Sequence, residues 1–251
     1  TCSGERDGSC LTAQQKTILA AVHTGAKTTT GTAIYNSFPY DPGIAGANWA
    51  AWKFANSLAL DPLAVGTVFG TPPAYMADPL TADADAHFAR ITATDTTYTE
   101  SGMDFMTPPN PSNLSTLKKR GAKVMVYHGV SDPIFSYDDS VTWYKNLAAA
   151  NDGDAGNFAR LYGVPGMNHC SGGPATDQFD MLSALVKWVE QGQAPDSVVA
   201  TARGTGNAGG VNAELPSSWS TSRTRPLCPY PKVATYQGSG SIEDAANFSC
   251  R

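Results

Sequence analysis

The stretch from Lys123 to Gly192 constrains the fold more than any other part of this sequence. It opens with KVMVYHG, a short apolar run that ends at Gly129, and continues with DDSVTWYKNLAAAN, which has the pattern of a helix with Asp138 or Asp139 as its N-cap. FARLYGV then indicates a second strand and DQFDMLSALVKWVEQG a second helix. Short continuous apolar runs are typical of strands that are buried on both faces. Strand, helix, strand and helix in this order predict a parallel sheet and an α/β fold.

The second helix is expected to be amphipathic and to end at Gly192, because glycine favours the left-handed conformation that closes many helices. Its apolar positions recur at helical spacing and predict one buried face. They are Phe179, Leu182, Leu185, Val186 and Val189.

The first hundred residues have a different texture. They begin with a short helix that Thr12 is expected to cap and Gly25 to end. Residues 28–111 then scatter aromatic side chains among Pro and Gly with little sustained periodicity. We therefore expect an irregular subdomain over residues 1–115 and the regular α/β domain over residues 116–251.

Length and charge exclude several classes of protein. A chain of 251 residues with 41% hydrophobic residues can bury a substantial core. Its net charge of -5 provides no basic surface for nucleic acid. No apolar run approaches the ~18 residues of a membrane-spanning helix. We expect neither nucleic acid nor a membrane as a partner.

The cysteines indicate an oxidising compartment. Cys2 and Cys10 bracket a short polar loop and Cys228 and Cys250 a second segment, so both pairs are expected to form disulfides. Closing the second loop contributes roughly 3 kcal/mol in the chain-entropy model. Disulfides persist in oxidising compartments, which predicts a secreted or periplasmic protein. Cys170 is the odd cysteine: a free thiol, an inert buried residue, or half of a bond to a cysteine outside this chain.

Two polar side chains directly follow the two predicted strands. Asp132 follows the first strand in HGVSDPIFS, and His169 follows the second in YGVPGMNHC. Catalytic groups collect at the carboxyl ends of strands in open parallel sheets, and this chain order is that of the last two triad members of α/β-hydrolases. His169 would act as general base and Asp132 would orient it. Alternatively, Asp132 caps a turn ahead of Pro133 and His169 is a surface residue, but their joint placement favours catalysis.

A hydrolase of this kind also needs a nucleophile. No G-x-S-x-G motif occurs in the sequence, and in α/β-hydrolases the serine precedes the aspartate by a long stretch. We therefore expect the serine upstream of Thr1, and a cysteine close to it could be the partner of Cys170. A cysteine hydrolase that uses Cys170 with His169 is a weaker alternative, since adjacent residues on one loop rarely reach the required geometry.

Several longer motifs resemble the tannase and feruloyl esterase family. They are YHGVSDPIFS, VPGMNHCSGGP, FDMLSALVKWVEQGQAPD and RTRPLCPYPKVATYQGSGSIEDAANFSC, and CSGERDGSC resembles a cysteine loop in the lid of these enzymes. The resemblance implies the C-terminal part of an α/β-hydrolase fold with an irregular lid subdomain. It also implies that Asp132 and His169 are the acid and the base, and that Cys170 is bonded to a cysteine beside the nucleophile.

The resemblance further implies a secreted serine esterase acting on small aromatic esters of the feruloyl or galloyl type. Trp52 and Phe135 are candidate substrate-binding residues, because aromatic rings stack on a phenolic acyl group. Hydrolysis of a terephthalate half-ester is a lesser alternative, since no arginine that could hold a free carboxylate occurs between Trp52 and Phe88. The chemistry requires no cofactor. The family's structural calcium loop would precede this chain, in which we expect no metal ligands.

A non-catalytic module that binds phenolics or polysaccharide is the alternative from another functional class. Other features are interpreted as structural. NDGDAGN lacks the spacing of an EF-hand loop and is expected to form a turn. His128 is expected to be a hydrogen-bonded structural histidine rather than part of the pocket floor. Asn113 and Asn247 lie in glycosylation sequons.

Overall fold

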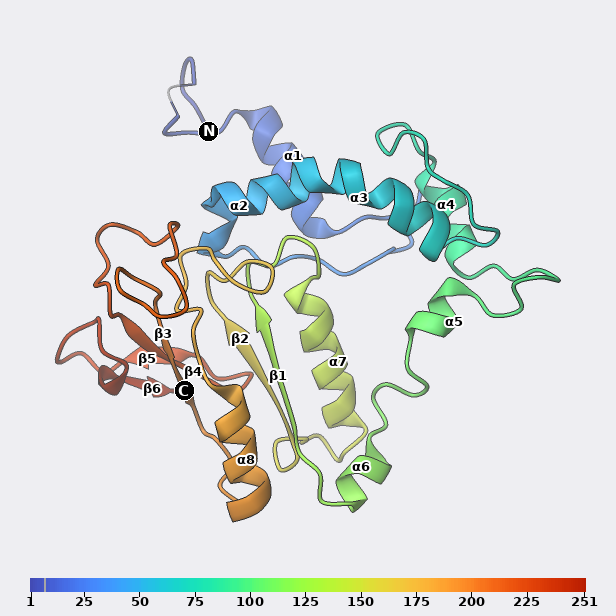
Figure 1. The fold of residues 1–251 in the computed structure, drawn as a ribbon. Helices are drawn as coiled ribbons and strands as arrows, with labels where there is room; N and C mark the ends of the chain where they lie inside the picture. Colours follow the sequence, from blue (N-terminus) through green and yellow to red (C-terminus); the bar gives the residue numbers. More distant parts are fainter. Residues whose placement is uncertain (7) are drawn as a thin grey trace. The chain divides into compact units, whose positions relative to one another are not determined.

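The computed structural model describes residues 1–6 and 8–251, and the chain divides into two compact units (Figure 1). The N-terminal unit comprises residues 1–40 and 57–107, and the C-terminal unit comprises residues 41–56 and 108–251. The expected boundary at residue 115 thus falls inside the C-terminal unit. The segment Asp41–Asn56 also belongs to this unit, because its polar groups bond to loops of the α/β part.

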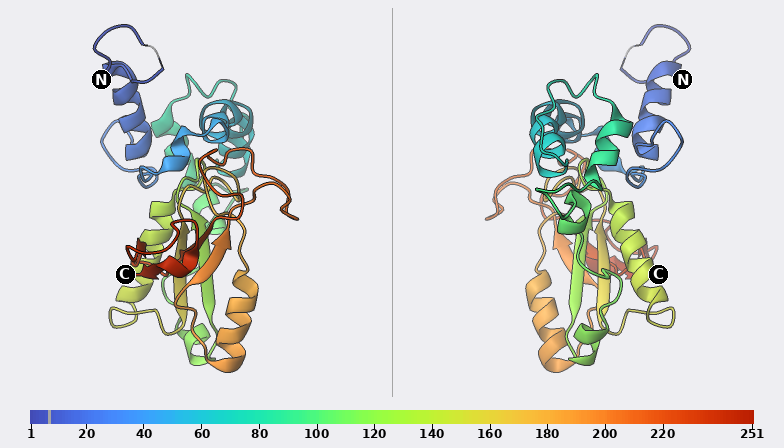
Figure 2. Two further views of the ribbon diagram at one scale, coloured as in Figure 1. Left: turned by 90° about the vertical axis from the view of Figure 1, so that its left-hand side faces the viewer. Right: turned by 90° about the vertical axis from the view of Figure 1, so that its right-hand side faces the viewer.

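The centre of the C-terminal unit is a pair of parallel strands. β1 (Val124–Gly129) pairs along its whole length with β2 (Ala159–Val164). α7 (Tyr137–Ala149) connects the strands and packs against both, whereas α8 (Met181–Gln191) follows β2 and packs against β1. Figure 2 shows the two helices on opposite sides of the strands. This arrangement confirms the predicted α/β fold and its parallel pairing.

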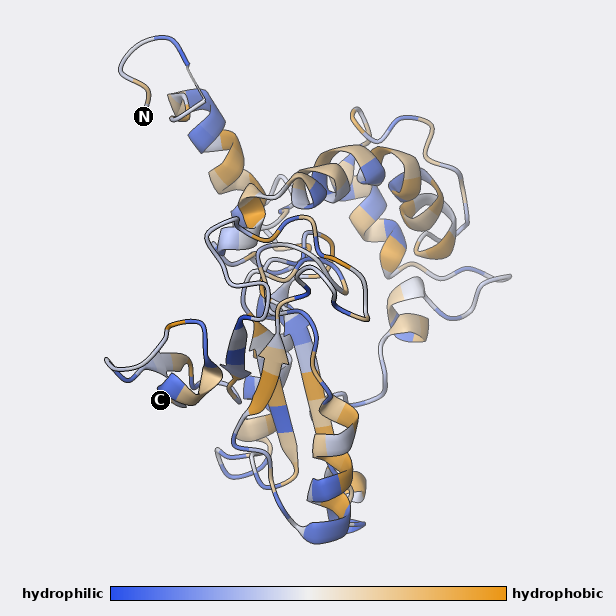
Figure 3. Ribbon diagram, turned by 60° about the vertical axis from the view of Figure 1, so that its left-hand side comes forward, coloured by the Kyte–Doolittle hydropathy of each residue, from blue (hydrophilic) through white to orange (hydrophobic). Residues whose placement is uncertain are grey.

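Each of these helices covers its own cluster of buried side chains. Side chains of a strand alternate between its two faces. Leu161 of β2 is buried with Leu147 and Phe158 on the side of α7, whereas Tyr162 is buried with Met181 on the side of α8. Figure 3 shows hydrophobic stretches in both strands, interrupted by hydrophilic positions. Fully burying one such side chain contributes about 1.5–3 kcal/mol, so the two clusters fix the strands and therefore the loops that leave them.

The predicted buried face of α8 is wrong at three of its five positions, whereas Phe179 packs against the core and Leu185 is half-buried. Three residues that were expected to be buried have 40–71% of their surface exposed: Leu182, Val186 and Val189. The helix instead turns Met181 and Trp188 inward, at 8% and 3% exposure. The centroid of the Trp188 ring also lies 5.3 Å from Lys123 Nζ and 5.4 Å from the Arg160 guanidinium. Because an indole buries more area than a valine or leucine and gains cation–π contacts here, Trp188 sets the rotation of the helix.

The ends of both helices follow ordinary capping chemistry. The N-cap of α7 is Ser136, whose Oγ accepts the N–H of Asp138, so the predicted N-cap at Asp138 or Asp139 is wrong. The two aspartates lie in the first turn instead, where their charges face the positive end of the helix dipole. Gly192 ends α8 with a φ of 69°, in the left-handed conformation, as predicted.

Two short antiparallel pairs follow α8. β3 (Val198–Thr201) pairs with β4 (Thr224–Leu227). β5 (Ala234–Tyr236) pairs with β6 (Phe248–Cys250), which directly follows the 3₁₀ turn η4 (Ala245–Asn247). Both pairs come after the two strand-end loops in the sequence and complete the C-terminal unit.

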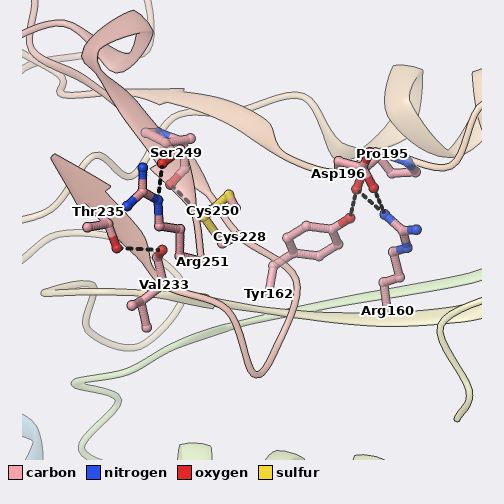
Figure 4. Close-up of a disulfide and its surroundings, with 11 residues drawn as sticks. Arg160, Tyr162, Pro195, Asp196, Cys228, Val233, Thr235, Ser249, Cys250 and Arg251 are labelled. Atoms are coloured by element: carbon pink, nitrogen blue, oxygen red, sulfur yellow. Dashed lines mark hydrogen bonds and ion pairs between the residues drawn. A yellow bond between two sulfur atoms is a disulfide. The ribbon is translucent and has the colours of Figure 1, made fainter. Parts of the chain in front are cut away.

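The predicted disulfide between Cys228 and Cys250 is present (Figure 4). It joins the residue after β4 to the last residue of β6. Between these cysteines, the N–H of Tyr230 donates to the carbonyl oxygen of Leu161 in β2 at 2.7 Å. The disulfide-bonded segment therefore borders the edge of β2 that faces away from β1.

The N-terminal unit consists of short helices and loops. α1 (Ala13–Thr24) begins at Thr12, which forms a capping box with Gln15, and ends at Gly25, as predicted. The helical elements that follow are α3 (Ser57–Leu63), the π-helical η3 (Ala64–Val68), α4 (Ala84–Ile91) and α5 (Gly102–Met106). Proline inside α3 and the π-helical turns after it agree with the irregularity expected of this part.

The predicted disulfide between Cys2 and Cys10 is also present. Asp7, in the loop that it closes, lies outside the described residues. Further helical elements belong to the C-terminal unit: η1 (Pro42–Ala45), α2 (Ala47–Ala50), the π-helical η2 (Ala51–Asn56) and α6 (Ser115–Lys119). In the part of the chain that the structure describes, no helix combines the length and the apolar character needed to cross a membrane.

Candidate active site

The first strand ends in a loop that holds Asp132. This residue is 5% exposed, and its Oδ1 accepts the N–H groups of Ile134 at 2.8 Å and Phe135 at 3.0 Å. Oδ1 of Asp132 therefore closes the turn through two hydrogen bonds, and Oδ2 remains available for other partners. At the end of β1, a Cβ on Gly129 would lie 2.4 Å from the carbonyl oxygen of Met167, so glycine is needed where this strand approaches the second loop.

The second strand ends in a loop that carries His169. Its Nδ1 lies 2.9 Å from Oδ2 of Asp132. Because a carboxylate only accepts hydrogen bonds, Nδ1 carries the proton and donates it. The neutral imidazole then has its lone pair on Nε2, which has no hydrogen-bond partner among the described residues, and the side chain is 24% exposed. The structure brings the two predicted residues together and leaves the basic nitrogen available.

Asp132 holds its negative charge more strongly than an ordinary aspartate. Burial raises its pKa, but hydrogen bonds from two imidazoles and two backbone N–H groups lower the pKa more, so that it lies below the usual value. The imidazoles are those of His128 and His169. An ionised carboxylate at this position fixes the tautomer of His169 and stabilises the imidazolium that forms when Nε2 takes a proton.

Three carboxylates from other parts of the C-terminal unit hold the loop of His169. Each accepts one backbone N–H at 2.8 Å: Asp41 from Gly166, Asp177 from Gly172 and Glu214 from Gly173. Asp41 also accepts the hydroxyl of Ser131 and so connects this loop to that of Asp132. Sequence reasoning missed Asp41 and Glu214, because neither belongs to a motif and they lie 125 and 41 residues from the glycines they bind.

Two aromatic rings flank the imidazole of His169. The ring centroid of Trp52, in η2, lies 5.5 Å from that of His169, and the centroid of Phe135 lies 5.4 Å from it. Phe135 is 62% exposed, so much of its ring is accessible. Lys53 donates from Nζ to the carbonyl oxygen of Pro133 at 3.2 Å and ties η2 to the loop of Asp132. Both predicted substrate-binding residues therefore lie beside His169.

Cys170 adjoins His169 and is exposed, so the alternative of an inert buried cysteine is wrong. It forms no disulfide within the described chain, where the other cysteines form the two bonds given above. Its φ is 65°, in the left-handed region that residues other than glycine adopt uncommonly. The backbone thus adopts a turn conformation at the residue that follows the imidazole.

The residues present do not fit a metal centre. Among the described residues, no group of three or more His, Cys, Asp or Glu side chains is placed to hold a metal ion. NDGDAGN forms turns between α7 and β2, as expected.

The fold and the site define an α/β protein with an acid–imidazole pair at the carboxyl ends of two adjacent parallel strands. The family model described as tannase and feruloyl esterase matches residues 1–251. The chain therefore belongs to the tannase and feruloyl esterase family, as its sequence motifs predict.

Curated relatives of this chain are ester hydrolases. Mono(2-hydroxyethyl) terephthalate hydrolase of Piscinibacter sakaiensis is 40% identical over 274 residues, which cover 99% of this chain and 43% of that protein. An uncharacterised esterase of Xanthomonas campestris pv. campestris is 32% identical over 288 residues, covering 99% and 48%. A probable feruloyl esterase B-2 of Neosartorya fischeri is 31% identical over 156 residues, covering 55% and 28%. The chain spans less than half the length of these relatives.

Solved structures support the same assignment. Feruloyl esterase B from Aspergillus oryzae is 25% identical with a TM-score of 0.68, over 97% of this chain and 47% of that chain. Tannin acyl hydrolase from Aspergillus niger is 15% identical with a TM-score of 0.60, over 96% and 42%, which shows a likeness of fold alone. The α/β-hydrolase-like fold expected from the sequence is thereby confirmed.

Proposed function

We propose that this chain supplies the acid, the base and part of the substrate site of a serine carboxylic ester hydrolase. The hydrogen bond between His169 Nδ1 and Asp132 Oδ2, at 2.9 Å, carries the proposal. It orients an imidazole that is 24% exposed and whose second nitrogen has no hydrogen-bond partner among the described residues. A general base needs one nitrogen accessible to the group that it deprotonates.

The nucleophile in this proposal is a serine in a segment of the same protein upstream of Thr1. Residues 116–251 then belong to the C-terminal part of the α/β-hydrolase domain and residues 1–115 to the C-terminal part of its lid, with residues 41–56 and 108–115 packed in the same compact unit as the hydrolase part. Two observations support the upstream segment. The sequence contains no G-x-S-x-G motif, and the relatives that match the chain along 99% of its length are more than twice as long.

The reaction would proceed through an acyl-enzyme. Nε2 of His169 takes the proton of the serine hydroxyl as its oxygen attacks the ester carbonyl, and Asp132 stabilises the resulting imidazolium. The imidazolium then returns the proton to the alkoxide oxygen of the departing alcohol. In the second half, His169 deprotonates a water molecule that hydrolyses the acyl-serine and regenerates both groups. General acid–base catalysis of this kind contributes about 10²–10⁴ in rate.

The substrate in this proposal is an ester of a neutral aromatic acid of the feruloyl or galloyl type. The rings of Trp52 and Phe135 lie beside the imidazole, where they can stack on a phenolic acyl group. A terephthalate half-ester carries a free carboxylate that needs a cation. Lys53 is the cation nearest Trp52 in the sequence, and its ammonium already binds the carbonyl oxygen of Pro133. This arrangement favours a neutral acyl group.

Cys170 in this proposal is bonded to a cysteine beside the nucleophilic serine, and the protein is secreted or periplasmic. The thiol is exposed next to the base, and the two disulfides within the chain require the same oxidising compartment. Peptide mapping of the complete protein under non-reducing conditions tests the bond. We expect a peptide containing Cys170 linked to one outside this chain. A freely titrating thiol at Cys170 in the native protein would contradict it.

The function is tested by expressing the complete open reading frame and measuring kcat/KM for methyl ferulate, methyl gallate and mono(2-hydroxyethyl) terephthalate. We expect a higher value on one of the two neutral phenolic esters. His169→Ala is expected to lower kcat by about 10²–10⁴-fold, and His87→Ala, in the N-terminal unit, serves as the control. Ligand binding without turnover in the complete protein would overturn the esterase proposal in favour of a binding module. Full activity of His169→Ala would overturn the assignment of the site.

A further inference from the structure

His128 lies beside the candidate acid and takes no part in the reaction proposed above. It is the penultimate residue of β1, and its side chain is 17% exposed. Its Nδ1 lies 2.8 Å from Oγ of Ser140 in α7. Its Nε2 lies 3.0 Å from the carbonyl oxygen of Phe135 and 3.5 Å from Oδ2 of Asp132. One imidazole thus spans the strand, the helix and the loop between them.

These partners determine the tautomer of His128. A carbonyl oxygen and a carboxylate oxygen can only accept hydrogen bonds, so Nε2 must carry a proton and donate it. Nδ1 of the neutral ring is then an acceptor, and the hydroxyl of Ser140 donates to it. The opposite tautomer would set the lone pair of Nε2 against two oxygens that are themselves only acceptors, which makes it unfavourable.

The Nε2–H of His128 therefore faces two residues that both contact His169. Asp132 Oδ2 bonds to His169 Nδ1 at 2.9 Å, and the ring of Phe135 lies 5.4 Å from the His169 ring. Phe135 is the exposed residue of this short loop, at 62%, whereas Asp132 is buried. The N–H of Phe135 is held by Asp132 Oδ1 and its carbonyl oxygen by His128, so the two side chains together fix its backbone.

We propose that His128 is a positioning residue, whose Nε2–H holds Asp132 and the backbone of Phe135 in the orientation that their contacts to His169 require. Only the catalytic consequence of this role rests on the proposed esterase function, because the positioning itself is a property of the folded chain.

Other ionisable groups around this contact are few. On α7, the Tyr137 ring lies 6.0 Å from the His128 ring, and burial raises the pKa of Tyr137 to about 12, so it stays neutral at physiological pH. Asp139 lines the same surface hollow as Ser140. From η2, Lys53 binds the carbonyl oxygen of Pro133. The dominant charge facing His128 is therefore that of Asp132.

The first test uses the complete protein without substitutions. Long-range ¹H–¹⁵N NMR spectra distinguish the two tautomers of a histidine, and the signals of His128 can be assigned with a His128→Gln variant. We expect His128 to be protonated at Nε2 at neutral pH. A ring protonated at Nδ1 alone would overturn the proposal, because Nε2 could not then donate to either Asp132 or Phe135.

The second test compares three variants by the ¹³C titration of the Asp132 carboxyl. His128→Phe keeps the ring but removes both nitrogens, and we expect the pKa of Asp132 to rise toward the ordinary value. His128→Gln keeps an N–H near the position of Nε2 and should restore the pKa of the unaltered chain. His87→Gln, in the N-terminal unit, is the control for loss of a histidine and should leave the pKa unchanged. An unchanged titration in His128→Phe would overturn the proposal.

The catalytic consequence is measured separately in the complete protein. We expect His128→Phe to lower kcat by roughly 10- to 100-fold through misplacement of the base, with recovery in His128→Gln. If the NMR results agree and the complete protein hydrolyses no ester, the esterase function fails and the positioning role stands. If the protein is an active esterase and the titration of Asp132 does not respond to His128→Phe, the positioning role fails alone.

Discussion

The two loops that meet at the candidate site are held in different ways. The acid loop, residues 130–136, orients Asp132 through its own N–H groups and through His128, which Ser140 fixes in turn, all within one strand–helix unit. The imidazole loop, residues 165–174, is held by Asp41 and Glu214, which come from 125 and 41 residues away. Of the three carboxylates that hold this loop, only Asp177 is close in sequence, five residues from the Gly172 whose N–H it accepts.

This difference indicates how each half of the pair is stabilised. The carboxylate of Asp132 depends mainly on local contacts that form when β1 and α7 pack together, while Asp41 and Lys53 bind its loop at Ser131 and Pro133. The imidazole side depends on the whole C-terminal unit, because segments before β1 and after α8 must both be in place to supply its acceptors. Substitutions in distant segments should therefore disturb the imidazole loop more than the turn around Asp132.

The largest effect is expected where the two loops join. Asp132→Asn places an amide opposite Nδ1 of His169, and because the amide nitrogen can only donate, it favours the wrong tautomer. We expect kcat of the complete protein on its best ester to fall by about 10⁴-fold. Near-ultraviolet circular dichroism should show the fold unchanged. A loss of less than tenfold with an intact fold would mean that the 2.9 Å contact is structural and not catalytic.

Asp41→Ala should break the distant support of the imidazole loop. Its carboxylate accepts the N–H groups of Gly43 and Gly166 and the hydroxyl of Ser131, and the variant leaves these donors without an acceptor. We expect the free energy of unfolding, measured with urea, to fall by about 2–4 kcal/mol.

The matched control for Asp41 is Asp196→Ala. Asp196 is also an acceptor in an ion pair, with Arg160 at 3.1 Å, but its side chain is 90% exposed. Exposed pairs of this kind contribute about 0–1 kcal/mol. Equal losses in the two variants would contradict the claim that Asp41 supports the loop through partly buried, distant contacts.

The same contrast explains how far the sequence could predict this molecule. Asp132 and His169 were predictable because each directly follows a recognisable apolar strand, and strand ends gather at one edge of a parallel sheet. Asp41 and Glu214 were not, since a carboxylate that bonds to a distant backbone N–H has no local pattern. Their role depends on the tertiary structure alone.

The errors in the predicted helices also arise because contacts between distant residues leave no local pattern in the sequence. Helical periodicity predicts that Leu182 and Val186 of α8 lie in the core, whereas the structure buries Trp188 instead. The contacts of Trp188 with Arg160 and Lys123 determine how the helix is rotated about its axis. Periodicity predicts that a helix has an apolar side. It does not predict which of two overlapping apolar faces of the helix packs against the sheet, because that choice depends on residues elsewhere in the chain.

Glu214→Gln is a milder change to the imidazole loop. The two carboxylate oxygens accept the N–H groups of Asn48 at 3.2 Å and Gly173 at 2.8 Å, but an amide offers one acceptor only. We expect the free energy of unfolding to fall by about 1–2 kcal/mol, with Glu190→Gln, on the exposed side of α8, as the control. Amide exchange should accelerate at Gly173 and stay unchanged at Ile134. Equal acceleration at both would mean that the loops are not held independently.

The smallest effect is expected in the pH dependence of stability, because for Asp132 burial opposes the hydrogen bonds and only their difference appears. Its pKa in the folded chain lies below the ordinary 3.8, so the folded state binds this proton less readily than the unfolded state. The carboxylate therefore stabilises the fold fully at pH values above the pKa of the unfolded state, and this contribution is lost as the pH falls through the pKa of the folded state.

Asp180 and Glu243 also have lowered pKa values, so the total loss of stability in acid is not specific to Asp132. The informative quantity is the difference between the unaltered chain and Asp132→Asn, measured by urea unfolding from neutral pH into this acidic range. We expect the stability advantage of the unaltered chain to shrink on acidification. An advantage that grows instead would show that burial outweighs the hydrogen bonds, and the acid loop would then hold a strained carboxylate rather than a stabilised one.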